Sequence, residues 1–214
     1  MLETHAVAPF HKNGFVVACD NTRAAVLIDP GDEIDGLLRF VEERRLSVGL
    51  ILLTHAHMDH VSGVGRAKRA TGARIGVHRE DVFLYNSAVE QGLVFGYRLE
   101  QPPPPDFNLE PGVPLAFGAC RIDVHHTPGH SPGGVCLHVA GPDVEQTHLF
   151  VGDTLFAGSI GRTDLPGGDY PTLIRSIRNV LFTFDDAALV HSGHGPDTTI
   201  GRERVTNPFL NRGV

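Results

Sequence analysis

The chain has few cysteines, no tryptophan and no long apolar run. Its three cysteines, Cys19, Cys120 and Cys136, are far apart and odd in number, so they predict neither a disulfide framework nor a CxxC zinc site. Such cysteine usage is typical of a reducing compartment, and residues 1–5 lack the basic and apolar regions of a secretory signal. No apolar run has the length that a bilayer requires. We therefore expect a soluble, cytoplasmic protein without a membrane partner.

Basic blocks are missing as well. The net charge is −7, and the densest basic stretch, Arg66-Ala67-Lys68-Arg69, has the spacing of a solvated helix face. Proteins that bind nucleic acid usually cluster lysine and arginine on one surface. We therefore expect no nucleic acid partner. The oligomeric state leaves no signal in the sequence.

The 214 residues have the composition of a globular protein, with 41% hydrophobic and 20% charged residues. No linker-like shift in composition and no short repeat divides the chain, so we expect a single domain over residues 1–214. Strand-like and helix-like segments come in two successive halves, each of which begins with strands and ends with a helix and a strand. This order predicts an α+β fold in which two sheets pack face to face.

Apolar periodicity and turn residues predict the individual elements. The predicted strands cover residues 2–10, 15–20, 24–28, 48–53, 74–77, 121–126, 134–139, 147–151 and 188–191, and the predicted helices cover 32–46, 63–71, 79–89 and 170–181. Asn13-Gly14 predicts a hairpin turn between the first two strands. The segment from Gln91 to Pro114 has no periodicity, and it is either a lid over a site or a surface excursion.

Four apolar strands have the same sequence pattern: each is followed by a histidine or an aspartate near glycine. The strand at residues 48–53 leads into His55-Ala56-His57-Met58-Asp59-His60, and the other three lead into residues 127–134, 150–156 and 191–196. If these strand ends converge, they bring together seven imidazole and carboxylate groups: His55, His57, Asp59, His60, His130, Asp153 and His194. Seven ligands are too many for one tetrahedral ion, and they suit two metals that share a carboxylate.

This pattern resembles the metallo-β-lactamase superfamily. The His55-Ala56-His57-Met58-Asp59-His60 motif is followed by His130, Asp153 and His194 in the superfamily's order, and the similarity runs from about Phe15 to the C-terminus. Within the superfamily, residues 152–156, 161–164 and 193–196 resemble short, single-domain bacterial proteins related to the type II glyoxalases, or hydroxyacylglutathione hydrolases. The resemblance implies an αββα sandwich, with helices outside the two sheets and the site at one edge of them.

The resemblance also implies an assignment of ligands and a reaction. Metal 1 would bind His55, His57 and His130, metal 2 would bind Asp59, His60 and His194, and Asp153 would bridge them. Two divalent ions, zinc in the first place and iron or manganese as alternatives, make hydroxide available at neutral pH, and Asp59 would orient it as the catalytic residue. The expected substrate is a small anionic thioester such as S-lactoylglutathione.

The chain departs from the two-domain glyoxalases, which carry a C-terminal helical domain that binds glutathione. We expect no such domain here, and the remaining candidate for substrate binding is Arg162, at the position where the family has a basic residue. The family's nearby aromatic residue is replaced by Asp164, so Arg162 either binds substrate or pairs with Asp164 or Asp169. Asp29 either supports a ligand histidine or begins a helix.

Other functions stay open. A mononuclear iron persulfide dioxygenase also resembles residues 161–164, but it uses two histidines and one aspartate, whereas His194 supplies a ligand for a second metal. A hydrolase of another ester, a lactone, a β-lactam or a phosphodiester would keep the same scaffold. The missing secretory signal disfavours a periplasmic β-lactamase, and the missing basic block disfavours a nuclease. A protein that only binds metal is disfavoured by the full ligand set. The remaining histidines, including His125 and His126, are expected outside the metal site.

Overall fold

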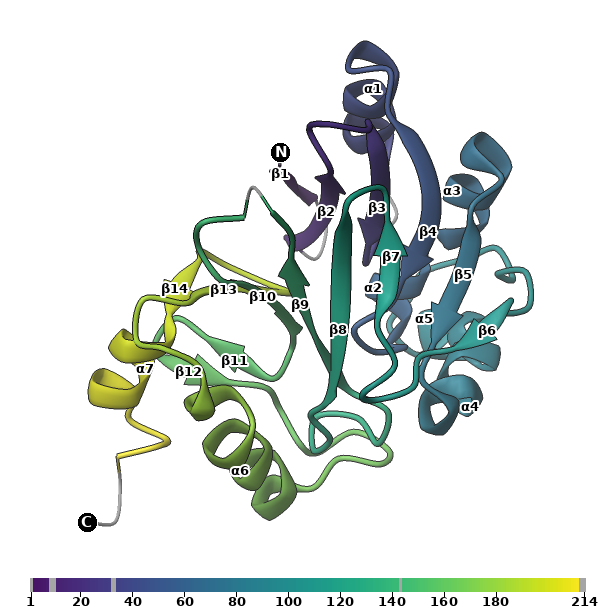
Figure 1. Ribbon diagram of the computed structural model, residues 1–214. Helices are drawn as coiled ribbons and strands as arrows, with labels where there is room; N and C mark the ends of the chain where they lie inside the picture. The colour runs from purple at the N-terminus through teal and green to yellow at the C-terminus, as the bar shows by residue number, and fades with distance from the viewer. Residues whose placement is uncertain (1, 8–10, 32–33, 143, 212–214) are drawn as a thin grey trace.

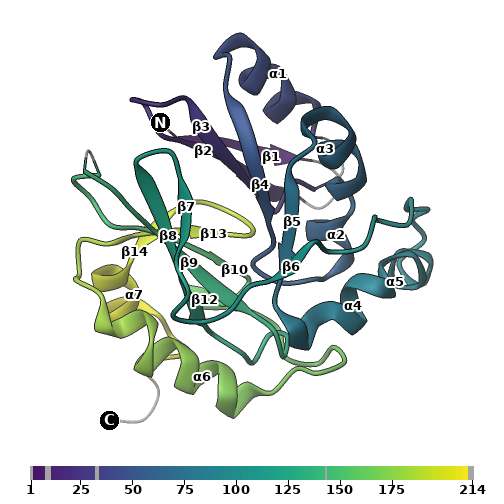
Figure 2. The ribbon, with the colours of Figure 1, turned by 45° about the vertical axis from the view of Figure 1, so that its right-hand side comes forward.

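Two six-stranded β-sheets face each other, and helices cover their outer faces (Figure 1; Figure 2). The computed structural model describes residues 2–7, 11–31, 34–142 and 144–211. The predicted α+β class and the αββα sandwich are confirmed. Among the described helices, none is both long enough and apolar enough to cross a membrane.

The N-terminal half forms the first sheet, in which the strands follow chain order. They are β1 (Leu2–Val7), β2 (Lys12–Ala18), β3 (Ala24–Ile28), β4 (Ser47–Leu52), β5 (Arg74–Val77) and β6 (Phe107–Asn108). The pairs from β1 to β3 are antiparallel and those from β3 to β6 are parallel, because helices provide the crossovers. The outer face carries α1 (Asp35–Glu43), α2 (Met58–Val61), α3 (Val64–Thr71), the short 3-10 turn η1 (Arg79–Asp81), α4 (Val82–Asn86) and α5 (Ala88–Val94) (Figure 2).

The C-terminal half forms the second sheet, in the order β14-β13-β10-β9-β8-β7. Its strands are β7 (Leu115–Phe117), β8 (Cys120–His126), β9 (Val135–Ala140), β10 (His148–Gly152), β13 (Leu189–Ser192) and β14 (Thr198–Thr199), and β11 (Leu155–Phe156) pairs separately with β12 (Ser159–Ile160). The outer face carries α6 (Tyr170–Asn179), the 3-10 turn η2 (Leu181–Thr183) and α7 (Ile200–Thr206). Because β10 and β13 are parallel, their C-terminal ends lie at the same edge.

The apolar side chains form three layers, one between the sheets and one under each set of helices. Neighbouring residues of a strand point to opposite faces, so Val26 and Ile28 pack between the sheets while Leu27 packs under the helices. Strand β4 is also covered on both faces, with Leu52 between the sheets and Ile51 under the helices. This double burial explains why its sequence is an apolar run without polar alternation.

The predicted turn at Asn13-Gly14 is wrong. Both residues lie inside β2, and Lys12 already pairs with Val7 of β1. Tertiary contacts override the local turn preference: Gly14 packs against α1 so closely that a Cβ atom there would lie 2.9 Å from Leu37 Cδ1. Residues 8–10, the predicted end of the first strand, lie outside the described residues.

The segment from Gln91 to Pro114 is more regular than predicted. The helix predicted over residues 79–89 is instead η1, α4 and α5, and α5 continues to Val94. Residues 107–108 add β6 to the parallel edge of the first sheet. The Tyr85 hydroxyl donates a hydrogen bond to Pro103 O at 2.6 Å, which holds the proline run against α4.

Candidate metal centre

The structure brings all seven predicted ligand residues together at one edge of the two sheets. His55 and His57 follow β4, Asp59 and His60 lie in the short helix α2, and His130, Asp153 and His194 follow β8, β10 and β13. His55, His57 and His130 form one group and Asp59, His60 and His194 form another, and in each group the donor atoms lie within 4.8 Å of one another. That these residues bind metal stays a prediction.

Three imidazole rings converge in the first group. His130 Nε2 lies 2.8 Å from His57 Nδ1 and 3.2 Å from His55 Nε2. Burial, with a smaller effect of the neighbouring imidazoles, lowers the pKa of His55 and lowers the pKa of His57 to about 3. Both rings are therefore neutral at physiological pH, which is the form of histidine that binds transition metals.

The second group combines imidazole and carboxylate. Asp59 Oδ2 lies 3.1 Å from His194 Nε2 and 3.8 Å from His60 Nε2. Burial by itself raises the pKa of Asp59, but His60, His194 and the Lys12 cation together hold it below its ordinary value. Asp59 is therefore ionised at neutral pH.

Asp153 faces both groups. Its Oδ1 lies 3.4 Å from His60 Nε2, and its Oδ2 lies 3.6 Å from His130 Nε2 and 3.6 Å from His194 Nε2. Only a carboxylate placed between two ligand groups can contact both in this way. The geometry therefore agrees with the expected bridging position.

Unpaired polar atoms test whether these residues fit metal ions. Among the described residues, His57 Nε2, His60 Nε2 and Asp153 Oδ1 are buried without a hydrogen-bond partner. An unpaired buried polar atom costs roughly 1–3 kcal/mol, so such atoms rarely gather without a reason. Imidazole nitrogen and carboxylate oxygen together suit zinc, iron and manganese. The donor set fits two divalent ions.

Asp29, at the end of β3, supports histidines of both groups. Its Oδ2 lies 3.0 Å from His60 Nδ1 and accepts a hydrogen bond from Thr54 Oγ1 at 2.5 Å, and Thr54 Oγ1 lies 3.2 Å from His55 Nδ1. Asp29 has a φ of 46°, a left-handed conformation that costs free energy in a residue with a Cβ atom. Of the two interpretations of Asp29, the structure favours the support of a ligand histidine.

We expect Asp29→Asn to weaken metal binding by about 10-fold to 100-fold, the usual effect of losing a residue that orients a ligand. Asparagine keeps the size of the side chain and tolerates the left-handed backbone, but it lacks the negative charge beside His60. Competition with a chromophoric chelator measures the affinity. Asp185→Asn, at an exposed position, serves as the control. Equal affinities of the two variants would contradict the role of Asp29.

Asp81 is a supporting residue that the sequence did not reveal. Its Oδ2 accepts hydrogen bonds from Ala56 N at 2.9 Å and from Ser131 Oγ at 2.8 Å, and its Oδ1 accepts one from Gly133 N at 2.6 Å. Asp81 therefore ties the loop after β4 to the loop after β8. An aspartate at the end of a 3-10 turn carries no local signal, so only the tertiary structure shows this role.

Strand β2 contributes two further buried polar residues. Asn13 Nδ2 donates to Ser192 O at 2.9 Å and to Gly195 O at 2.8 Å, which holds the loop that carries His194. Lys12 Nζ donates to the carbonyl of Asp29. Burial lowers the pKa of Lys12 to about 8, against the opposing effect of nearby carboxylates. These contacts explain why Asn13 lies in a strand and not in a turn.

Gly193 lies directly against the centre. A Cβ atom at this position would lie 2.2 Å from Asp153 Oδ1 and 2.8 Å from His60 Cε1. We expect Gly193→Ala to displace Asp153, to reduce the metal content by about one ion per chain and to destabilise the fold by about 1–3 kcal/mol, as overpacking does. Elemental analysis and thermal unfolding measure both effects.

The matched control is Gly49→Ala. Gly49 lies in β4, and a Cβ atom there would meet nothing within 4 Å. This variant should keep the metal content and the unfolding temperature of the parent protein. A fully loaded Gly193→Ala protein of unchanged stability would show that the loop after β13 adjusts freely.

A cavity of about 240 Å³ opens beside the centre, and Gln91, Phe95 and Arg162 border it together with residues of both ligand groups. The Arg162 guanidinium is paired with Asp164, with Nε and Nη2 each 2.7 Å from a carboxylate oxygen. Its backbone carbonyl lies 2.8 Å from His130 Nδ1 and orients that ring. Both interpretations of Arg162 thus have support, because it borders the cavity and forms an ion pair.

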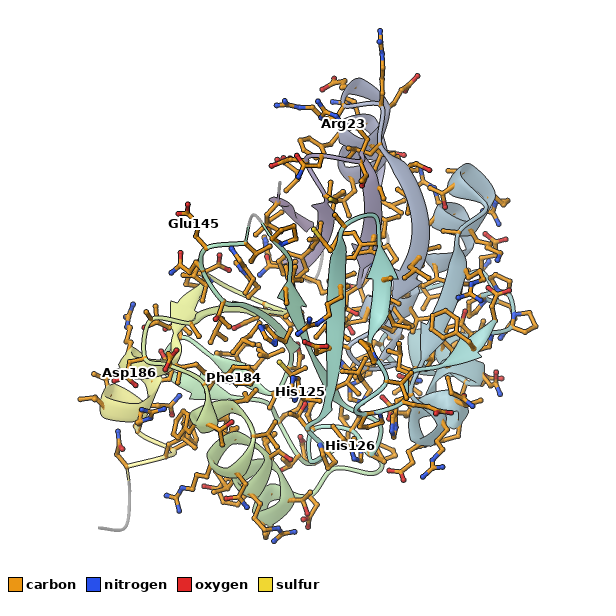
Figure 3. The ribbon with its side chains drawn as sticks, in the orientation of Figure 1. Arg23, His125, His126, Glu145, Phe184 and Asp186 are labelled. Carbon is orange, nitrogen blue, oxygen red and sulfur yellow. The ribbon has the colours of Figure 1, made fainter. Side chains whose placement is uncertain are left out.

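His125 and His126, labelled in Figure 3, precede the His130 turn on β8. The His125 ring packs against Phe184 with centroids 5.3 Å apart, and the His126 ring stacks on His78 at 4.4 Å. These contacts agree with the expectation that neither residue belongs to the centre. The sequence did not single out the association of His126 with His78 and Glu80, whose donor atoms also lie within 4.8 Å of one another.

Comparison with known proteins decides the family. A profile of the Metallo-beta-lactamase superfamily matches residues 7–194, which include all seven residues of the centre. The chain belongs to the metallo-β-lactamase superfamily. Its membership confirms the resemblance, and the chain is accordingly a metal-dependent hydrolase.

Members of the superfamily resemble the chain over nearly its whole length. Hydroxyacylglutathione hydrolase GloC of Haemophilus influenzae is 41% identical over 98% of both chains. The crystal structure of the BLEG-1 B3 metallo-beta-lactamase has a TM-score of 0.89 at 36% identity, and the alignment covers 99% of this chain and 100% of that one. The structure of TTHA1623 in a di-iron-bound form has a TM-score of 0.86 at 40% identity, with 97% and 100% covered.

Proposed function

We propose that the chain is a dinuclear-metal thioesterase of the glyoxalase II type, which hydrolyses S-lactoylglutathione or a related acyl thioester. The observation that carries the proposal is the position of Asp153, whose two oxygens lie 3.4–3.6 Å from histidines of both groups. The 41% identity to a hydroxyacylglutathione hydrolase over the full chain supports the substrate class.

In this proposal each ion has its own group of ligands and Asp153 is shared. His55, His57 and His130 hold metal 1, and Asp59, His60 and His194 hold metal 2. Zinc suits neutral imidazole and carboxylate ligands, and iron and manganese accept the same set. A di-iron form of a structure at 40% identity supports iron as the alternative.

Two such ions lower the pKa of bound water to about 7 and polarise a carbonyl group. The part of the reaction that the chain itself performs centres on Asp59, which borders the cavity. Because its pKa is held below the ordinary value, Asp59 offers an ionised oxygen that accepts a hydrogen bond from the attacking water and orients it. The leaving group is a thiolate, which needs no strong general acid because thiols ionise near pH 8.5.

A single preparation tests the proposal. The metal content of the purified protein is counted, and the same sample is assayed with S-lactoylglutathione. We expect two ions per chain and a kcat/KM of about 10⁴ M⁻¹s⁻¹ or more, within the usual range of enzymes. A protein that holds two ions and hydrolyses no thioester would refute the thioesterase.

Two other outcomes identify other functions. One iron per chain, with oxygen uptake on glutathione persulfide, would identify the dioxygenase; the position of His194, 3.1 Å from Asp59, supports the dinuclear hydrolase instead. Hydrolysis of β-lactams is the second candidate, because the BLEG-1 B3 metallo-beta-lactamase is 36% identical with a TM-score of 0.89. A β-lactam substrate in the same assay, compared by kcat/KM, decides between the two.

A further inference from the structure

An apolar groove lies beside the catalytic cavity. It has a volume of about 230 Å³ and lies between the α4–α5 pair and the loop at residues 165–166. His57, Gln91, Phe95 and Leu165 border both the groove and the catalytic cavity. The groove therefore adjoins the catalytic cavity.

The walls of the groove are unusually apolar for an exposed surface. Phe83 is 50% exposed, Val94 is 81% exposed and Phe95 is 50% exposed. Of the eight large hydrophobic residues that are exposed in the described parts of the chain, these three border the groove. Clustered apolar exposure of this kind marks a binding site, because a folded protein gains no stability from it.

The lack of charged side chains around the groove also favours an apolar ligand. None of the described residues that border the groove is aspartate, glutamate, lysine or arginine. Among the described residues that border the catalytic cavity, Arg162 is the one arginine or lysine, and its guanidinium is already paired with Asp164 at 2.7 Å. Glutathione carries two carboxylates, and carboxylates bind most strongly to free cations. The surface offers apolar contact instead.

We propose that the preferred substrate is a thioester with an apolar arm that lies in this groove. A methylene group takes up about the volume of a water molecule, about 30 Å³, so the groove holds an arm of about six to eight carbons. The arm belongs to the acyl group or to the thiol, since either is attached to the bond that is broken. This inference rests on the proposed thioesterase function.

Two series of thioesters test the inference on the metal-loaded enzyme. The first keeps glutathione as the thiol and lengthens the acyl group from acetyl to octanoyl; the second keeps the acetyl group and lengthens an alkanethiol from ethyl to octyl. We expect kcat/KM to rise by about threefold to fourfold per methylene in one series, up to about six carbons. A rise in the first series identifies an acyl arm and a rise in the second a thiol arm. Flat or falling values in both series would overturn the inference.

A matched pair of variants locates the effect. Val94→Asn places a polar group in the groove, whereas Leu93→Asn changes the neighbouring residue of α5, which is 60% exposed and borders neither cavity. In whichever series shows the rise, the ratio of kcat/KM between the octyl or octanoyl member and the shortest member should fall at least fivefold in Val94→Asn and stay unchanged in Leu93→Asn. Equal ratios in the two variants would show that the groove does not select the substrate.

The two proposals fail in different ways. If the loaded enzyme hydrolyses lactoyl and acetyl thioesters but ignores chain length, the thioesterase stands and the apolar arm is wrong. If it hydrolyses no thioester, the proposed thioesterase function is wrong, and so is the proposal that the substrate is a thioester with an apolar arm. In that case, the fluorescence of 1-anilinonaphthalene-8-sulfonate still measures whether the groove binds an apolar molecule. The affinity for this dye should weaken at least fivefold in Val94→Asn and stay unchanged in Leu93→Asn. Equal binding by both variants would overturn the groove as an apolar site.

Discussion

Asp59→Asn should lower kcat/KM for S-lactoylglutathione by about 10²-fold to 10⁴-fold, the range expected for a group that handles a proton in the transition state. Asparagine has nearly the same shape as aspartate, so packing around α2 should be kept. It carries no negative charge, however, so its amide oxygen accepts a weaker hydrogen bond from the attacking water than the carboxylate does. The loss should therefore appear mainly in kcat, because substrate binding does not require the charge.

Loss of metal could cause the same decrease, so the metal content must be measured in the same samples. Asp59 Oδ2 lies 3.1 Å from His194 Nε2, and its removal should weaken the second ion more than the first. Adding metal until two ions are bound should leave most of the kcat defect in place. The exposed Asp185→Asn variant is the control for the substitution itself. Full activity after reloading would show that Asp59 only binds metal and does not orient water.

Removal of both ions with a chelator should abolish hydrolysis and destabilise the protein. Stabilisation by a bound ion follows from mass action and reaches about 4 kcal/mol when the free metal is about 1,000 times its dissociation constant. For a chain of this size, 1 kcal/mol shifts Tm by about 2–4 °C, so loss of one such ion should lower the unfolding temperature by about 8–16 °C, and loss of both ions by about twice as much. The physical reason is that several buried polar atoms, His60 Nε2 among them, would then remain unpaired.

Zinc is titrated back into the metal-free protein, and differential scanning calorimetry and the thioesterase assay are applied at each step. Activity and Tm should both return when zinc is added back, with an end point at two ions per chain. A variant with Asp185→Asn should respond like the parent protein, whereas Asp29→Asn should need more zinc because His60 loses its partner. Hydrolysis that survives complete removal of metal would contradict the metal-dependent mechanism.

The seven residues of the centre can be predicted from the sequence because each follows an apolar strand and because their spacing matches a family pattern. The layered fold can be predicted for a similar reason, since strand and helix periodicities separate the chain into two halves. Prediction fails where distant contacts decide the local conformation. Asn13 has the preference of a turn residue, but its amide binds the carbonyls of Ser192, at the end of β13, and of Gly195, in the loop after that strand.

Which side chains are the candidate metal ligands follows from the amino-acid order alone, because histidine and aspartate at strand ends are recognisable as a pattern. How these side chains are held, and what surrounds them, depends on the tertiary structure. Asp81 acts through hydrogen bonds to residues 25 and about 50 positions away, and the carbonyl of Arg162 orients His130 across 32 positions. Contacts between segments so far apart leave no periodic pattern. The apolar groove has the same origin, since Val94 and Leu165 border one cavity only because α5 and the 165–166 loop lie on either side of it.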